Sequence, residues 1–157
     1  MELQQDTHKL TIVSYNLHGL NQGCPYLETL CDDYDIVMTQ EHWLAPFDLD
    51  RLNYININMT CYASSAMDDV ISKGCLRGRP FGGVAVFVKN CIAANATLIK
   101  SAPRYIILQL GQTLLVNVYL PCSSTVCRDE EFDDCLACIM NEITNVSYST
   151  VLSLVVL

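Results

Sequence analysis

Short apolar segments that end in glycine, proline or polar residues recur along the chain, and they constrain the fold more than any other feature. They cover residues 10–15, 35–39, 84–89, 105–110, 114–119 and 151–157. Their length is typical of β-strands, and Gly111-Gln112 predicts a tight hairpin turn between two of them. Residues 25–33 and 128–144 carry apolar residues at helical spacing, whereas residues 45–79 are expected to be irregular. The pattern predicts a layered α/β fold of mostly antiparallel strands.

Composition narrows the class of protein further. The chain has 157 residues, of which 51% are apolar, and a net charge of −8. This fits one domain with its own core, and it argues against a disordered chain or a globally basic nucleic-acid-binding domain. No apolar segment reaches the roughly 20 residues that span a bilayer, and the N-terminus does not read as a signal peptide. We therefore expect an intracellular protein that is not inserted in a membrane.

Nine cysteines cannot all pair within one chain, so we expect free thiols in a reducing compartment. Cys135-x-x-Cys138 has the spacing of half a zinc site, but it falls within a predicted helix and no second pair follows it. Two buried thiols are the preferred interpretation.

Three polar residues follow apolar strands, where a rigid scaffold presents side chains to a ligand. Asn16 follows residues 10–15, Glu41 follows the segment that begins at Asp35, and Tyr119 ends residues 114–119. Carboxylate and amide oxygens suit Mg²⁺. A solvated loop glutamate, a turn-forming asparagine and an ordinary strand aromatic are the alternatives.

Four motifs stand in a fixed order. They are S-Y-N-L-H-G-L (14–20), D-I-V-M-T-Q-E-H-W-L (35–44), R-G-R-P-F-G-G-V-A-V-F-V-K (77–89) and L-L-V-N-V-Y-L-P (114–121). Together they resemble the endonuclease/exonuclease/phosphatase superfamily, which implies a DNase I-like four-layer α/β sandwich. Q-E-H-W-L and R-G-R-P-F-G-G-V-A resemble, more narrowly, the endonuclease domain of non-LTR (LINE-type) retrotransposons.

The resemblance implies a role for each matched residue. Glu41 matches the metal-binding glutamate, Asn16 matches the asparagine beside the metal and the scissile phosphate, and Tyr119 matches the tyrosine that helps to hold the phosphate. The implied reaction is Mg²⁺- or Mn²⁺-dependent hydrolysis of a DNA phosphodiester, here by a DNA-nicking endonuclease in the nucleus. Other superfamily members, acting on lipids or RNA, and a non-catalytic remnant are the alternatives.

The chain departs from the family at its later motifs. The family completes its site with Asp-x-Asn and a terminal Asp-His pair, which orients or deprotonates water. The last histidine here is His42, and no aspartate follows Asp134. We therefore expect residues 1–157 to form the N-terminal portion of one such domain, truncated after the first half or so, with little or no turnover. His18 and His42 are interpreted as solvated or structural residues rather than substitutes.

Local charge differs from the net charge. The segment from Lys73 to Arg104 contains six basic and no acidic residues, so it could meet a nucleic-acid backbone. By resemblance the partner is DNA, and Arg79 is the best candidate for a phosphate contact. The alternative is a set of ordinary solvated cations.

Overall fold

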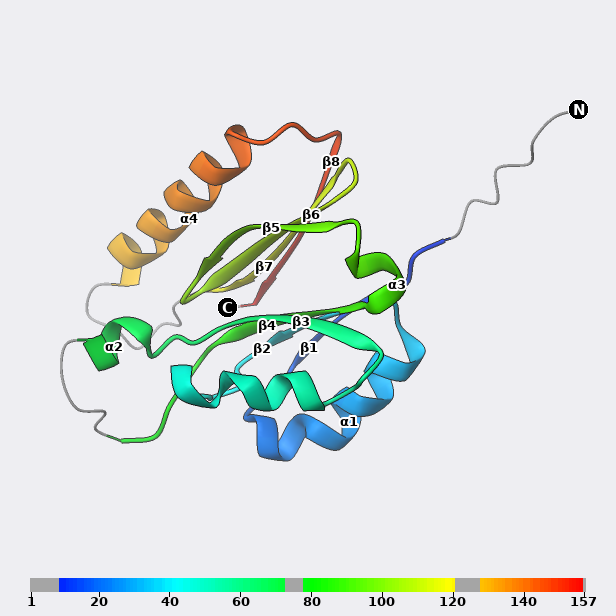
Figure 1. The fold of residues 1–157 in the computed structure, drawn as a ribbon. Helices are drawn as coiled ribbons and strands as arrows, with labels where there is room; N and C mark the ends of the chain where they lie inside the picture. Colours follow the sequence, from blue (N-terminus) through cyan, green and yellow to red (C-terminus); the bar gives the residue numbers. More distant parts are fainter. Residues whose placement is uncertain (1–8, 73–77, 121–127, 157) are drawn as a thin grey trace, which may run out of the picture.

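Two four-stranded sheets form the centre of the molecule (Figure 1). The computed structural model describes residues 9–72, 78–120 and 128–156. The first sheet has the order β1-β2-β4-β3, formed by β1 (Ile12–Asn16), β2 (Ile36–Gln40), β3 (Met59–Ser64) and β4 (Val84–Lys89). The second has the order β5-β6-β7-β8, formed by β5 (Ala96–Ala102), β6 (Tyr105–Leu110), β7 (Thr113–Tyr119) and β8 (Thr150–Val156). β1 pairs with β2 and β7 with β8 in parallel, and the other neighbours are antiparallel.

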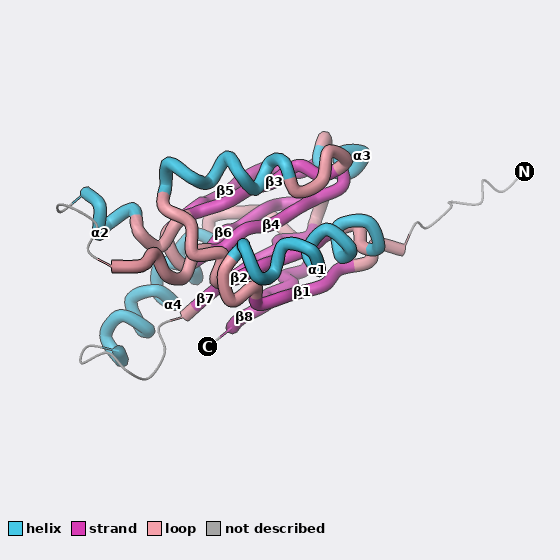
Figure 2. The backbone as a smooth tube through the Cα atoms, turned by 90° about the horizontal axis from the view of Figure 1, so that it is seen from below, coloured by secondary structure: helices cyan, strands magenta, loops and turns pink. Residues whose placement is uncertain are grey.

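Two longer helices, α1 (Leu20–Asp33) and α4 (Arg128–Thr144), cover the outer faces of the sheets, and three shorter helical segments complete the set in the described residues. The shorter segments are the 3-10 helix η1 (Pro46–Tyr54), α2 (Asp68–Ser72) and α3 (Asn90–Ala93). Figure 2, viewed from the side of the first sheet, shows α1 lying across β1 and β2. Figure 1 shows α4 on the far face of the second sheet. The arrangement is helix, sheet, sheet, helix, which is the four-layer α/β sandwich predicted from the sequence.

Each interface between layers has its own apolar core. Leu27 and Leu30 of α1 pack with Val37 and Phe87 on the first sheet. Between the sheets, side chains of β2 and β4 meet side chains of β6 and β7: Ile36, Met38, Val84, Val86, Val88, Ile106, Leu108 and Leu115. Ile139 and Ile143 of α4 pack on the outer face of β6 and β7. Burial on both faces explains why the central strands read as nearly continuous apolar segments.

Three hydrogen bonds of Asn117 cross the apolar layer between the sheets. Gln40 Nε2 of β2 donates to Asn117 Oδ1 of β7 at 2.6 Å, and both residues are fully buried. Asn117 Nδ2 donates in turn to the carbonyls of Thr39 and Ala85. These bonds satisfy amides that would otherwise be costly to bury.

The sequence prediction was wrong about the start of the first helix. We expected it at residue 25, because Gly23 breaks the pattern and proline is favoured at the first position of a helix, but α1 begins at Leu20. A Cβ at Gly23 would lie 2.6 Å from Leu17 Cδ2 and 2.9 Å from the Leu17 carbonyl oxygen. Glycine therefore allows α1 to pack closely on the segment that precedes it.

Two strands fall outside the predicted ones. β3 lies within the region that we expected to be irregular, and β5 was not predicted. The hairpin between β6 and β7 is confirmed, with Gly111 in a left-handed conformation at φ 59°.

The thiol prediction holds for one of the two cysteines of the C-x-x-C pair. Cys135 is buried, but Cys138 is exposed because it lies on the outer side of α4. The described cysteines are free thiols, and Cys75, Cys122 and Cys127 lie outside the described residues. Across the described ranges, no helix combines the length and apolarity needed to cross a membrane.

Candidate functional site

Asn16 and Glu41 lie in direct contact at one end of the first sheet. Asn16 is the last residue of β1, and Glu41 follows β2, the parallel neighbour of β1. Asn16 Nδ2 donates to Glu41 Oε1 at 2.8 Å, and the Glu41 side chain is only 15% exposed. Asn16 Oδ1 accepts the backbone N–H of His18 at 3.1 Å. The amide therefore bridges the loop after β1 and the carboxylate after β2, which fixes the orientation of both.

The backbone around this contact is unusual. In the described ranges, the non-glycine residues with a positive φ are His18 at 48°, Glu41 at 58° and Trp43 at 56°. Side chains with a Cβ rarely adopt this conformation. Such residues cost on the order of 1–3 kcal/mol each and gather at functional sites. Their clustering here marks the Asn16–Glu41 contact as a candidate site independently of the sequence motifs.

Main-chain hydrogen bonds between three loops hold this conformation. Gly19 N–H donates to the carbonyl of Glu41 at 2.8 Å, and Glu41 N–H donates to the carbonyl of Gly83 at 2.8 Å. Trp43 N–H donates to the carbonyl of Gly82 at 3.0 Å. The loops that follow β1 and β2 and the turn that precedes β4 are thus paired edge to edge.

His42 is a structural residue, as the sequence predicted. Its ring is fully buried, Nδ1 accepts the Leu44 N–H at 3.0 Å, and Nε2 lies 3.0 Å from the Ser64 carbonyl. The Nδ1 bond leaves the proton on Nε2, so the ring is neutral and donates to Ser64. Burial lowers the pKa of His42 to about 4. A Cβ at Gly83 would lie 2.3 Å from the ring, so glycine is required beneath it.

His18 lies closer to the site than the sequence suggested. Its side chain is 69% exposed, as expected for a solvated residue, yet Nδ1 lies 3.4 Å from Glu41 Oε2. The two carboxylate oxygens of Glu41 therefore face different partners, Asn16 on one side and His18 on the other. Loop residues two positions beyond a strand carry no periodic signal that would have indicated this contact.

Tyr119 approaches the same loops from the second sheet. It ends β7, and its backbone N–H donates to the Arg104 carbonyl at 2.8 Å. A Cβ on Gly82 would lie 3.5 Å from Tyr119 Cε1, so the ring packs along the Gly82-Gly83 turn. Because the same turn is hydrogen-bonded to Glu41, Tyr119 lies near the loop that carries Glu41.

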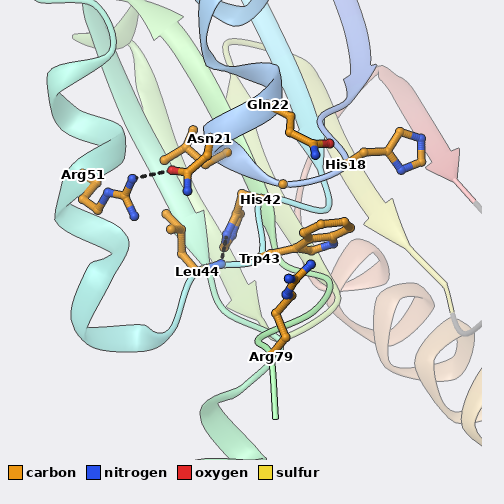
Figure 3. Close-up of a pocket in the computed structure, with 10 residues that line it drawn as sticks. His18, Asn21, Gln22, His42, Trp43, Leu44, Arg51 and Arg79 are labelled. Atoms are coloured by element: carbon orange, nitrogen blue, oxygen red, sulfur yellow. Dashed lines mark hydrogen bonds between the residues drawn. The ribbon is translucent and has the colours of Figure 1, made fainter.

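Arg79 lines a pocket beside this site (Figure 3). His18 and Trp43 line the same pocket, which has a volume of about 360 Å³. Sequence reasoning named Arg79 as a phosphate contact but gave no role to Trp43. The four predicted site residues thus fall at one end of the molecule, with Asn16 and Glu41 in contact and with Tyr119 and Arg79 on neighbouring segments.

The basic segment from Lys73 to Arg104 is not one continuous surface. Lys89 pairs with Asp35 at 3.2 Å, at the opposite end of the first sheet from Glu41. Lys100 pairs with Glu142 at 3.4 Å, and Arg104 pairs with Glu131 at 3.7 Å, both on α4. Lys73 and Arg77 lie outside the described residues. Of the cations described in this segment, Arg79 is the one beside the candidate site.

No protein-family model and no curated protein matches the chain. Among solved structures, a variant of the 3′ phosphatase NExo from Neisseria bound to product DNA hairpin is similar with a TM-score of 0.62 and 16% identity, covering 92% of this chain and 57% of that one. The AP endonuclease LMAP from Leishmania major has a TM-score of 0.60 at 15% identity, covering 81% and 46%. An AP endonuclease from Archaeoglobus fulgidus has a TM-score of 0.52 at 15% identity, covering 87% and 50%.

These similarities define the class of fold. The chain has the mixed α/β, two-sheet architecture of the DNase I-like endonuclease/exonuclease/phosphatase structures, and the predicted fold class is confirmed. It spans about half the length of the solved structures that it matches. Those structures are named as a 3′ phosphatase and as AP endonucleases, and none of these names refers to a retrotransposon.

Proposed function

We propose that this chain supplies the metal- and phosphate-binding part of a metal-dependent DNA endonuclease of the non-LTR retrotransposon type. The observation that carries the proposal is the 2.8 Å bond between Asn16 Nδ2 and Glu41 Oε1, formed where two parallel strands end and where the backbone of Glu41 is left-handed. The left-handed backbone of Glu41 and the side-chain amide of Asn16 together fix the position of the Glu41 carboxylate. That degree of preorganisation is typical of a ligand site.

The donor set fits a single Mg²⁺ or Mn²⁺ ion. Magnesium is usually bound through one or two carboxylates and keeps its other positions for water and substrate phosphate. Glu41 would be the protein ligand, since Oε1 accepts from Asn16 while Oε2 lies 3.4 Å from Nδ1 of the exposed His18 ring. In the described residues, no group of three or more His, Cys, Asp or Glu side chains is arranged to hold a metal ion. In this proposal the ion is therefore bound together with the substrate phosphate. A bound ion would stabilise charge on the phosphate and the leaving oxygen.

The remaining residues have positioning roles in this proposal. Asn16 orients Glu41, and Tyr119 supports a phosphate oxygen next to the Gly82-Gly83 turn. Arg79 contributes positive charge from the neighbouring pocket. The 157 residues contain no histidine after His42 and no aspartate after Asp134 that could activate water as the family's later motifs do. We therefore expect little or no turnover from this chain alone.

Manganese binding tests the metal site without relying on turnover. We expect the free Mn²⁺ signal in electron paramagnetic resonance to fall when the chain is added with a short DNA duplex. The Glu41→Gln variant should lose this effect, and Glu28→Gln, which removes an exposed carboxylate on α1, should retain it. Equal Mn²⁺ binding by the wild-type chain and Glu41→Gln would contradict the proposed site.

Nicking of supercoiled plasmid in Mg²⁺ tests the reaction. The chain alone is expected to produce no more than traces of open circles. Nicking that disappears in Glu41→Gln would contradict the expected inactivity and establish the endonuclease reaction directly. Mn²⁺ binding that is insensitive to DNA, with no nicking, would favour the non-catalytic remnant.

A further inference from the structure

The pocket beside Glu41 has features of a nucleotide site rather than of a plain phosphate contact. His18, Asn21, Gln22, Trp43, Arg51 and Arg79 are among the residues that line it (Figure 3). We propose that it binds one unpaired nucleotide of the DNA strand, with the base stacked on Trp43 and its phosphate paired with Arg79. The inference rests on the proposed function for the identity of the polymer, but the pocket itself is separate from the metal ligand.

Trp43 is held as a flat surface on one side of the pocket. Its backbone is left-handed at φ 56°, and its N–H is tied to the Gly82 carbonyl at 3.0 Å. A Cβ on Gly19 would lie 2.6 Å from Trp43 Cε3, so the indole packs directly over a residue that has no side chain. The ring is half-buried, which leaves part of it open to the pocket. A fixed, partly exposed indole suits base stacking, since every base presents a π face.

The lining is cationic. Arg51 and Arg79 both line the pocket, and none of its lining residues in the described part of the chain is acidic. Arg51 Nη2 donates to Asn21 Oδ1 at 2.8 Å, so this guanidinium is anchored. Arg79 is exposed, and Figure 3 shows its guanidinium pointing toward the indole of Trp43. An exposed arginine beside an aromatic surface can pair with a phosphate and also stack on a base.

Two side-chain amides complete the polar part of the pocket. Because Asn21 Oδ1 accepts from Arg51, the Nδ2 of Asn21 remains a donor, and the exposed Gln22 amide offers both a donor and an acceptor. These groups match the polar edge of a base. The volume of about 360 Å³ lies near the lower end of the roughly 300–1,000 Å³ range of small-ligand sites. It suits one nucleotide and is too small for a duplex.

The position of the pocket relates it to the metal ligand. His18 lines the pocket and also lies 3.4 Å from Glu41 Oε2. A nucleotide in the pocket would therefore place the adjoining phosphate of its strand next to Glu41. In this arrangement the pocket selects where along the strand the reactive phosphate lies.

The experiment uses Trp43, the only tryptophan of the chain, as its reporter. The 157-residue chain is titrated with a short single-stranded oligothymidylate in EDTA while tryptophan fluorescence is followed. A second titration uses the same oligonucleotide with abasic residues in place of thymidine. We expect the first strand to quench Trp43 fluorescence and to bind about tenfold more tightly than the abasic strand, since only bases can stack.

Two matched arginine variants test whether Arg79 contacts a phosphate. Arg79→Gln should weaken binding and lower the slope of log Kd against log salt by about one, as expected for one lost phosphate contact. Arg104→Gln removes the same charge from the same basic segment, but at the ion pair with Glu131 outside the pocket, so it should behave as wild type. Both residues have at least partly exposed side chains, so circular dichroism should show an unchanged fold.

Two results would overturn the proposal. Equal quenching and affinity with the thymidine and abasic strands would exclude base stacking. Equal binding by Arg79→Gln and Arg104→Gln would exclude a phosphate contact at Arg79. Glu41→Gln separates the two proposals, because it should abolish Mn²⁺ binding and leave the quenching of Trp43 by the oligonucleotide intact.

Discussion

Gln40 on β2 and Asn117 on β7 are joined by a 2.6 Å hydrogen bond that crosses the apolar interior between the two sheets. Both side chains are fully buried. Gln40 is the last residue of β2 and directly precedes Glu41. Asn117 lies two residues before Tyr119 on β7. The bond therefore fixes the register of one sheet against the other immediately behind the candidate site.

Asn117→Ala should lower the free energy of unfolding by about 2 to 4 kcal/mol, because it removes one bond to the Gln40 amide and one bond each to the Thr39 and Ala85 carbonyls in the buried interior. Urea denaturation measures this. Gln109→Ala is the matched control, since Gln109 also donates to two carbonyls but lies at the surface. It should cost less than about 1 kcal/mol. Similar losses in the two variants would contradict a structural role for the buried amide.

Gly83→Ala should be strongly destabilising. A Cβ at this position would lie 2.3 Å from the buried His42 ring, and the backbone has φ 87°. The clash and the unfavourable conformation together should cost about 2 to 4 kcal/mol. Gly111→Ala provides the comparison, because φ is 59° but no atom lies within 4 Å. Thermal denaturation should show a loss of about 1 kcal/mol there, so the difference reports the packing against His42.

The ion pair at the far end of the first sheet predicts an acid-sensitive contribution to stability. Bonds from the Thr11 backbone and hydroxyl, both at 2.9 Å, and then Lys89 at 3.2 Å hold the pKa of Asp35 below its usual value of 3.8. A carboxyl with a lowered folded-state pKa stabilises the protein above its unfolded pKa, and this contribution is lost as pH falls through the folded pKa.

Asp35→Asn should therefore cost about 1 to 3 kcal/mol near neutral pH, and the difference from wild type should shrink below about pH 4. Urea denaturation at both pH values measures it. Asp33→Asn, at an exposed position on α1, should change stability little at either pH. A difference for Asp35→Asn that is constant with pH would exclude linkage to its titration.

Asn16→Ala should weaken Mn²⁺ binding by about 10- to 100-fold, because groups that orient a metal ligand contribute this much to affinity. The reason is the 2.8 Å bond that holds Glu41 Oε1. Asn53→Ala, an exposed residue of η1, should bind Mn²⁺ as the wild-type chain does. Loss of Mn²⁺ binding in Glu41→Gln with no change in Asn16→Ala would mean that Glu41 does not depend on Asn16 for its orientation.

The sequence predicted the central strands and the edge strands β1 and β8, but it missed the edge strands β3 and β5. Residues 84–89, 105–110 and 114–119 are buried on both faces and read as apolar segments. β3 and β5 lie at sheet edges, where side chains are half-exposed and mixed in character, so no apolar segment or strict alternation marks them. Strand propensity in such half-exposed segments depends on packing against neighbouring strands, which a local pattern does not contain.

For the candidate site, strand ends predicted Asn16 and Glu41 because a buried strand fixes the position of the residue that follows it. The left-handed backbone of His18, Glu41 and Trp43 could not be predicted, since these residue types normally avoid that conformation. Asn117 was visible as an amide within an apolar strand, but its partner Gln40 lies 77 positions away. Only the packing of the two sheets brings them together.

The edge-to-edge pairing of the three loops has a consequence for how such a protein can change over evolution. Besides the Asn16 side chain, main-chain hydrogen bonds hold the loop of Gly19 against that of Glu41 and the loop of Glu41 against Gly83. Exposed residues beside these loops, such as Asn21 at the start of α1 and Arg79, can therefore be exchanged without displacing the carboxylate. The surface around the site can thus change in sequence during evolution while Glu41 stays in place.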